Sequence, residues 1–250
     1  MRKLGLIHRP HPNVPMLAAH LQINALAPVS SCDWHRFATL NGDALGNDAH
    51  SNCIPCGALR SVQIMRAVVA GDRRVPTVQN SLALYQQMGW DGTVASDIGL
   101  PSDETTAFWA SKGIWWGNDW LDIPSFARID PSNPEHARLA IAYFGPLQVD
   151  ILLPNSAQSQ TKWTVVPGPT GAVGSWGPHR VCIGKYDSHG FTAVTWGTQI
   201  EMTDEFFLAY VANIEVPISR SWFNTVGVSP TGLDFESLAA ASSQLAPVSP

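Results

Sequence analysis

The chain has 250 residues, of which 45% are hydrophobic and only 14% are charged, and its net charge is −5. This length suffices for one large domain or two small ones. The sequence contains no run of Lys and Arg, which argues against a nucleic-acid partner. The ten Trp, 20 Gly and 19 Pro favour a loop-rich fold with large aromatic anchors.

No apolar run reaches the length of a transmembrane helix, so we expect no membrane partner. Pro10 and Pro12 follow the basic start, where a signal peptide would have its apolar core, and secretion by a signal peptide is therefore not expected. The cysteines are too few for a disulfide framework, and we expect free thiols. They are Cys32, Cys53, Cys56 and Cys182.

Residues 1–44 are predicted to form an extended, Pro-rich N-terminal arm, with a short helix over 17–26. Apolar residues at helical spacing then predict a long helix over 54–70 that ends at Gly71. Pro55 fits only the first turn of this helix, so Asn52 is the expected N-cap and Cys53 lies at the helix start.

Three further helices are predicted before residue 146, at 78–88 with Thr77 as cap, at 102–112 with Ser102 or Asp103 as cap, and at 135–144 after Pro134. A long loop at 155–178 is typical of a functional or partner-contacting loop. Strands are predicted at 147–153, 179–186, 191–196 and 214–218, and helices at 204–211 and 234–245.

Helices precede strands in this order, which predicts an α+β protein with two lobes. The domain 45–220 would comprise a helical lobe at 45–145 and a sheet lobe at 146–220, followed by a C-terminal helix and tail at 221–250. A cleft between the lobes would face the start of the long helix.

Cys53 is a candidate nucleophile because a helix N-terminus favours a thiolate over a thiol. The alternative is a small buried residue at a loop–helix junction. His179 is the candidate base, since it begins a predicted strand beside the cleft, although a purely structural role is equally compatible with that position. His50 is closer in sequence to Cys53 but is expected to pack in the turn.

A zinc site is a second interpretation, because Cys53 with Cys56 and His179 with Cys182 have the spacing of two ligand pairs. Residues three apart on a strand point to opposite faces, so His179 and Cys182 should not converge. We therefore expect no metal and no organic cofactor.

Several short motifs resemble papain-like cysteine peptidases, and more closely a group of papain-fold proteins of bacteria and phages. The match extends over roughly residues 45–240 in order, which chance spacing rarely produces. The matching pieces are Leu45-Gly46-Asn47-Asp48 with Cys53, Gly89-Trp90, Asp97-Ile98-Gly99, Trp109 with Gly113-Ile114, Phe144-Gly145, His179 with Gly184-Lys185-Tyr186-Asp187, and Thr195-Trp196-Gly197.

The resemblance implies a papain-like fold whose second lobe is an antiparallel sheet or half-barrel. It implies that Cys53 is the nucleophile, that His179 is the base, and that the two form a thiolate–imidazolium pair. Asn47, six residues before Cys53, matches the side chain that stabilises the oxyanion. The family's orienting Asn is replaced by Val194, which leaves Thr195 or Asp187 as possible orienting residues.

Two functions of different classes follow. The first is a papain-like cysteine hydrolase, a peptidase or amidase, that uses a Cys53–His179 dyad on a peptide or protein substrate. The alternative is a structural component of a phage virion with weak or no catalytic activity, held to neighbouring proteins by the N-terminal arm and C-terminal tail. The expected location is the cytoplasm or an assembled virion.

Overall fold

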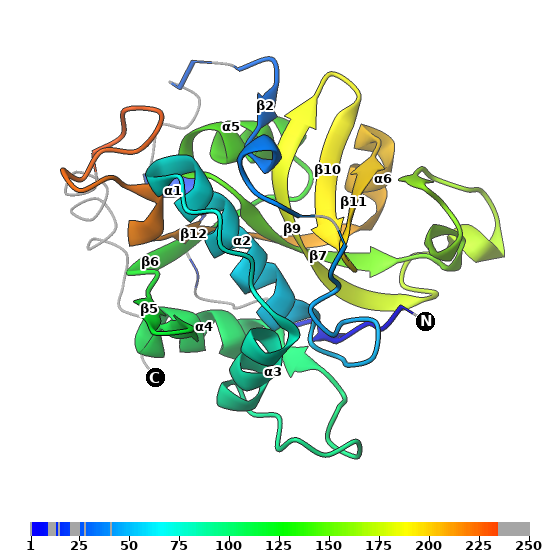
Figure 1. Ribbon diagram of the computed structural model, residues 1–250. Coiled ribbons are helices and arrows are strands. Elements are labelled where there is room, and N and C mark those ends of the chain that lie inside the picture. Colours follow the sequence, from blue (N-terminus) through cyan, green and yellow to red (C-terminus); the bar gives the residue numbers. More distant parts are fainter. Residues whose placement is uncertain are drawn as a thin grey trace.

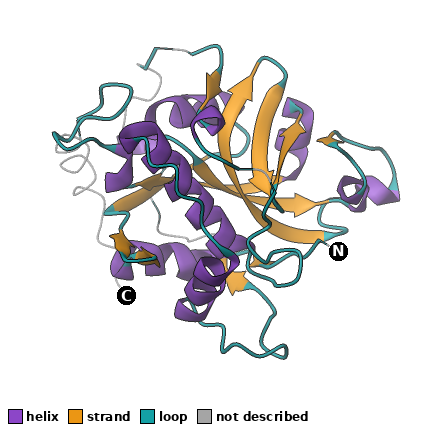
Figure 2. Ribbon diagram, in the orientation of Figure 1, coloured by secondary structure: helices purple, strands orange, loops and turns teal. Residues whose placement is uncertain are grey.

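The computed structural model describes residues 2–9, 14, 16–20, 26–27, 29–40 and 42–234. Helices gather on one side of the molecule and a large sheet on the other, with a few helices flanking the sheet (Figures 1 and 2). The helix predicted at 234–245 lies almost entirely outside the described residues. Helix α1 is Leu17–His20, and the rest of the helix predicted at 17–26 is not described as helix.

The central helix is α2, Cys53–Ala70, and it begins and ends where the sequence predicts. Gly71 ends the helix in the left-handed conformation, with φ of 65°, which glycine adopts without strain. Most of α2 is buried, because it packs on the sheet through β9 and on the helical side through α3. The helix is long and apolar enough to cross a membrane by composition alone, yet 72% of it is buried inside this fold, as expected for a core helix.

Helix α3, Val78–Gln87, starts with the predicted Thr77 in a capping box with Asn80. Helix α4 is Ser102–Lys112, and the predicted cap was wrong: Pro101 holds the N-cap position and no side chain caps the helix. The Ser102 hydroxyl instead bonds the backbone of Arg9. These bonds to Arg9 take the place of the hydrogen bond by which Ser102 was expected to cap the helix.

An eight-stranded sheet forms the second lobe, in the order β6-β12-β7-β9-β10-β11-β8, with β2 also paired to β9. Its pairs are antiparallel except β11–β8, which is parallel. The strands are β2 Cys32–Asp33, β6 Ser125–Ile129, β7 Leu147–Leu153, β8 Lys162–Trp163, β9 Gly177–Asp187, β10 Gly190–Thr195, β11 Thr198–Met202 and β12 Val211–Ile218.

Two helices, α5 at Pro134–Phe144 and α6 at Asp204–Tyr210, pack against this sheet. Strand β6 comes before residue 146 in sequence but pairs with β12, so the segment 125–144 joins the sheet side of the molecule. The sequence prediction missed β6, β8 and β11. Each is short or interrupted by polar residues, so the alternation of apolar and polar side chains that marks a strand is weak.

Two small sheets complete the fold. Strands β4, Ile114–Trp116, and β5, Asp119–Leu121, form a hairpin where only an aromatic cluster was expected. Strand β1, Leu6–Ile7, pairs in parallel with β3, Leu100–Pro101. The second pairing attaches the very beginning of the chain to the helical lobe.

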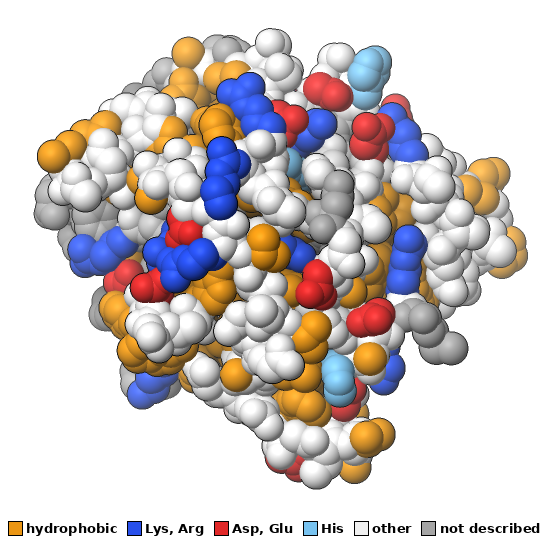
Figure 3. Space-filling model, in the orientation of Figure 1, with side chains coloured by type: hydrophobic (Ala, Val, Ile, Leu, Met, Phe, Trp, Pro, Cys, Tyr) orange, Lys and Arg blue, Asp and Glu red, His pale blue; other side chains and the backbone are white. Residues whose placement is uncertain are grey.

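Acidic and basic side chains are interspersed on the face shown in Figure 3, and no basic patch gathers on that face. Several of these charges form surface ion pairs, among them Arg74 with Asp72 at 2.7 Å and Arg66 with Asp119 at 2.9 Å. Exposed pairs of this kind contribute little to stability.

Candidate active site

Cys53 begins α2 and is only 1% exposed. Asn52 holds the N-cap position, but its side chain makes hydrogen bonds elsewhere, including one to the preceding loop, and does not cap the helix. Its Nδ2 donates to the Leu45 carbonyl and to Oγ of Ser81, each at 2.9 Å. The loop before the helix is thereby fixed, and Cys53 is held at the helix end.

His179 lies fully buried in β9. Its Nε2 is 2.7 Å from Oγ1 of Thr195, and its ring stacks on Trp196 with centroids 4.2 Å apart and planes 9° apart. Trp196 and Gly197 have φ of 46° and 71°, as the two central residues of a type I′ hairpin require. This turn between β10 and β11 brings the indole over the imidazole.

Thr195, and not Val194, contacts the imidazole because side chains alternate along a strand. Val194 pairs with Cys182 across the two strands, and His179 is an odd number of residues from Cys182. Val194 therefore packs on the opposite face, in a cluster with Cys182 and Ile64. Of the two candidate orienting residues, Thr195 is the one whose side chain contacts His179.

The Cys53 sulfur lies against the same strand. The backbone N–H groups of Arg180 and Gly5 face this sulfur and lower its pKa. The Arg180 N–H belongs to the peptide bond that follows His179, so the thiol and the imidazole adjoin one peptide unit of β9. Within the described part of the chain, Nδ1 of His179 has no hydrogen-bond partner, so the two groups are not hydrogen-bonded in this conformation.

Both groups are neutral here. Burial raises the pKa of Cys53 from 9.0 to about 12, although the N–H of Arg180 works in the other direction. Burial, helped by the charge of Arg2, lowers the pKa of His179 from 6.5 to about 3. The family resemblance implies an ion pair, whereas this closed site holds a thiol and a neutral imidazole, because water is excluded from both.

A pH dependence of stability follows from His179. Its folded pKa of about 3 lies below the ordinary value of 6.5, so its contribution is complete above pH 6.5 and is lost as the pH falls towards 3. We expect the free energy of unfolding to drop by about 2 kcal/mol between pH 7 and pH 5 from this group. Urea unfolding of wild type and His179→Gln across this range tests it, since equal pH slopes would contradict the assignment.

Residues 2–9, called the leading segment below, cover the site. The Lys3 N–H donates to the carbonyl of Asn47 at 3.1 Å, and Nε1 of Trp196 donates to the Lys3 carbonyl at 2.9 Å. Gly5 then passes directly over Cys53, and its carbonyl accepts the Leu100 N–H at 3.0 Å. In Figure 1 this segment runs past the N-terminal end of α2.

The rest of the leading segment is anchored as firmly. Leu6 is 5% exposed and packs in an apolar cluster with Cys53 and Trp90. Nδ1 of His8 lies 3.5 Å from a carboxylate oxygen of Asp150, an ion-pair distance at the outer limit of hydrogen bonding. The cleft is thus filled by an extended stretch of the chain's own backbone.

Of the other predicted site residues, Asn47 is near Cys53 and Asp187 is remote. Asn47 is 1% exposed and lines the same cavity as Cys53. One of its two Nδ2 hydrogens is donated to the His50 carbonyl at 3.0 Å. Asp187 lies eight residues further along β9 than His179, about 26 Å at the rise of a strand, and its carboxylate accepts the His189 N–H.

A buried charge cluster, which the sequence analysis missed, lies beside Cys53 and His179. Arg180 pairs with Asp150 at 2.6 Å and with Glu215 at 2.9 Å, and all three side chains are at most 2% exposed. Asn213 donates to both carboxylates, and Thr106 of α4 donates to Glu215. Single acidic residues inside the apolar strands β7 and β12 were the signal that could have predicted it.

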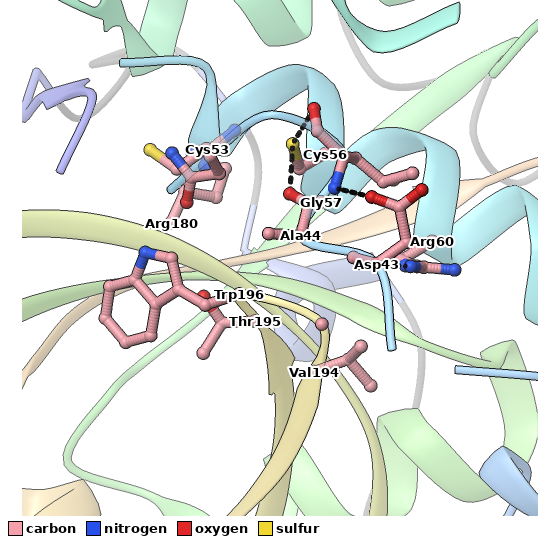
Figure 4. A pocket seen from close by; sticks show the side chains of 13 residues that line it. Asp43, Ala44, Cys53, Cys56, Gly57, Arg60, Arg180, Val194, Thr195 and Trp196 are labelled. Atoms are coloured by element: carbon pink, nitrogen blue, oxygen red, sulfur yellow. Dashed lines mark hydrogen bonds between the residues drawn. The ribbon is translucent and has the colours of Figure 1, made fainter. Parts of the chain in front are cut away.

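A small cavity of about 10 Å³, room for about one water, lies under Cys53. Figure 4 shows its lining: Cys53 and Cys56 come from α2, whereas Thr195 and Trp196 come from the other lobe. Among the residues that the structure describes, no group of three or more His, Cys, Asp or Glu side chains is placed to hold a metal ion. Cys182 accepts a hydrogen bond from Ser61, away from His179.

Comparison with known proteins supports this architecture. No protein-family profile and no curated protein sequence matches the chain. Among solved structures, xylellain, a cysteine protease from Xylella fastidiosa, is similar with a TM-score of 0.61 and 16% identity over 86% of this chain and 97% of that one. A procathepsin B from Trypanosoma congolense has a TM-score of 0.63 and 9% identity, over 87% and 86%.

A digestive procathepsin L of Tenebrio molitor is also similar, with a TM-score of 0.57 and 14% identity, over 83% of this chain and 74% of that chain. At such identities the likeness establishes the fold. The chain has the α+β, two-lobe papain-like fold, and the predicted fold class is confirmed.

Proposed function

We propose that this protein is a papain-like cysteine hydrolase, a peptidase or amidase, whose leading segment holds it in a closed state. The observation that carries the proposal is the meeting of Cys53, at the N-terminus of α2, with the β9 peptide that bears His179. Nδ1 of His179, the nitrogen not engaged by Thr195, has no hydrogen-bond partner among the described residues.

Opening the leading segment would remove Gly5 from the sulfur and Arg2 from the imidazole. Both groups would regain water, and their pKa values would return towards their ordinary ranges. His179 would then turn Nδ1 to the thiol and accept its proton, while Thr195 and Trp196 hold the ring.

The Cys53 thiolate would attack the substrate carbonyl carbon and form a tetrahedral oxyanion. The backbone N–H of Cys53 and the second Nδ2 hydrogen of Asn47 are the proposed donors to that oxyanion. The His179 imidazolium would then protonate the leaving amine, and water would release the acyl group. No step calls for a cofactor.

The occupant of the cleft supports a polypeptide substrate. Leu6–Ile7 of the leading segment pair in parallel with Leu100–Pro101, as an added strand would. A sheet edge that binds one extended peptide through backbone groups can bind another.

The test is a variant that lacks residues 1–9, incubated with a mixture of synthetic peptides and analysed by mass spectrometry. We expect the truncated protein to cleave peptides. The same truncation with Cys53→Ala should not cleave them. Iodoacetamide should also label Cys53 of the truncated protein faster than Cys32 or Cys182 at neutral pH. If neither cleavage nor preferential labelling appears, the hydrolase proposal fails.

A second prediction concerns Thr195 as a positioning residue. Thr195→Val keeps the shape but leaves Nε2 of His179 without a partner, so the imidazole loses its fixed orientation. In the truncated enzyme we expect kcat to fall about 10- to 100-fold, which is less than the roughly 10²- to 10⁴-fold of a complete general-base contribution because the imidazole is still present, with KM little changed. Recovery of kcat in Thr195→Ser, which keeps the hydroxyl, separates orientation from packing; no recovery would contradict the role.

A structural role in a phage virion is the second proposal, with partners along the N-terminal arm and C-terminal tail. The neutral, covered site and Val194 in place of an orienting Asn favour it. The leading segment counts against it, because these residues pack on their own chain. Closeness to the bacterial and phage proteins remains a prediction, and a truncated variant without activity that copurifies with particles would favour this role.

A further inference from the structure

Two cysteines share the first turn of α2. Cys53-Ile54-Pro55-Cys56 is a Cys-X-X-Cys sequence at a helix start, the arrangement that disulfide oxidoreductases use. Residues three apart in an α-helix have Cα atoms about 5 Å apart, inside the range of about 4.4–6.8 Å found across disulfides. The backbone therefore already has the spacing of a disulfide.

The two thiols differ in their surroundings. The Cys53 sulfur faces the N–H groups of Gly5 and Arg180. The Cys56 sulfur instead faces the Leu45 carbonyl at 3.6 Å and Oγ of Ser81 at 3.3 Å. Bonding the two sulfurs therefore requires the Cys53 side chain to turn from Gly5 and Arg180 towards Cys56.

Access favours Cys56 as the first thiol to react. Cys56 is partly exposed, whereas Cys53 is buried. Both line the cavity beneath the site, which has room for about one water, at about 10 Å³. A space of this size excludes a bulky disulfide oxidant, and the partial exposure of Cys56 favours a small oxidant such as hydrogen peroxide.

We propose that Cys53 and Cys56 form a reversible disulfide when a peroxide oxidises the site. The Cys56 sulfur attacks one peroxide oxygen, so an S–O bond forms, the O–O bond breaks, and water leaves with the thiol proton. The Cys53 sulfur then attacks the Cys56 sulfur, so an S–S bond forms, the S–O bond breaks, and a second water leaves. Two thiols lose two electrons to one peroxide.

The disulfide would remove the nucleophile and also protect it from irreversible oxidation. That consequence rests on the proposed hydrolase function, but the disulfide itself does not. Its formation needs a thiolate, and burial raises the pKa of Cys56 to about 12. Oxidation should therefore accelerate about tenfold per pH unit between pH 7 and pH 9, where the thiolate fraction rises in that proportion.

The experiment uses the full chain and hydrogen peroxide, with an acid quench followed by N-ethylmaleimide in urea. Trypsin releases the peptide 37–60, which contains no Lys or Arg before its last residue and carries only Cys53 and Cys56. We expect this peptide to lose both maleimide labels and the mass of two hydrogens. Dithiothreitol before labelling should restore both labels.

Variants sharpen the result. Cys56→Ser should abolish the mass loss and leave Cys53 to oxidise irreversibly, whereas Cys32→Ser should leave both rate and product unchanged. The proposal is overturned if peroxide oxidises Cys32 while the peptide 37–60 keeps two labels. It is also overturned if Cys56 stops at a sulfinic acid or pairs with another cysteine. Because the readout is a mass, a failed hydrolase assay would not affect it.

Discussion

Replacing Gly5 by Ala is expected to open the active site and expose Cys53. A Cβ atom at Gly5 would overlap the backbone carbonyl of Ser51, and a Cβ atom at Gly99 would overlap the backbone carbonyl of Gly5. Neither neighbour can yield, because both contacts are with backbone. The leading segment must therefore move away from the cleft.

Overpacking of this kind costs about 1–3 kcal/mol, so the iodoacetamide labelling rate of Cys53 should rise about 10- to 100-fold. The free energy of unfolding should fall by no more than the same amount, because the variant can relieve the overlap by releasing the leading segment while the rest of the core stays packed. Mass spectrometry of the labelled peptide 37–60 measures the rate, with Cys182 as an internal reference.

Arg9→Ala is the matched control, because Arg9 belongs to the same segment but its side chain is half exposed and pairs with the exposed Glu104. Such a pair is worth at most about 1 kcal/mol, and labelling should stay within a few-fold of wild type. Equal labelling in Gly5→Ala and wild type would show that the leading segment does not guard Cys53.

The second large effect is expected at Arg180. Arg180→Met would leave the carboxylates of Asp150 and Glu215 buried without their cation. Breaking a buried ion pair from one side costs about 3–5 kcal/mol, and we expect a loss of that size in the free energy of unfolding at pH 7. Urea denaturation followed by tryptophan fluorescence measures it.

The fold shifts the pKa values of the two acids in the cluster in opposite directions. Burial raises the pKa of Asp150, but the charge of Arg180 and the hydrogen bonds from Arg180 and Asn213 outweigh it, so the pKa lies below its ordinary 3.8. For Glu215, burial dominates and the repulsion of Asp150 adds to it, so the pKa is raised above 4.5. The fold therefore makes Asp150 easier to ionise than a free Asp side chain, and Glu215 harder to ionise than a free Glu side chain.

The signs follow by linkage. Asp150 stabilises the fold above pH 3.8, and that stability is lost as the pH falls through its lowered pKa. The contribution of Glu215 is complete below pH 4.5 and is lost as the pH rises through its raised pKa. Asp150→Asn should thus lower the free energy of unfolding by about 2 kcal/mol at pH 7. Glu215→Gln should lower it by less, and the free energy of unfolding of this variant should decline less steeply above pH 4.5. A larger loss of unfolding free energy in Glu215→Gln than in Asp150→Asn would contradict this assignment.

Local signals in the sequence were reliable where a single segment decides the structure. The helix at Cys53–Ala70 needed only apolar spacing, a Pro in its first turn and a terminal Gly71. The strand that bears His179 was predicted equally well from its local sequence. The cap predicted at Ser102 failed because its hydroxyl found a partner in Arg9, 93 residues away, and no local rule includes such a partner.

The sequence by itself determined that a cysteine lies at a helix start, that a histidine lies on a strand, and that a two-lobe α+β fold brings the lobes together. These follow from periodicity and capping, which act over a few residues. Only the tertiary structure decided that Thr195 faces His179, since that depends on the pairing of β9 with β10 and on the tight turn at Trp196. It also decided that residues 2–9 occupy the cleft and that Arg180 is neutralised by two distant acids, because burial and charge pairing depend on groups far apart in the chain.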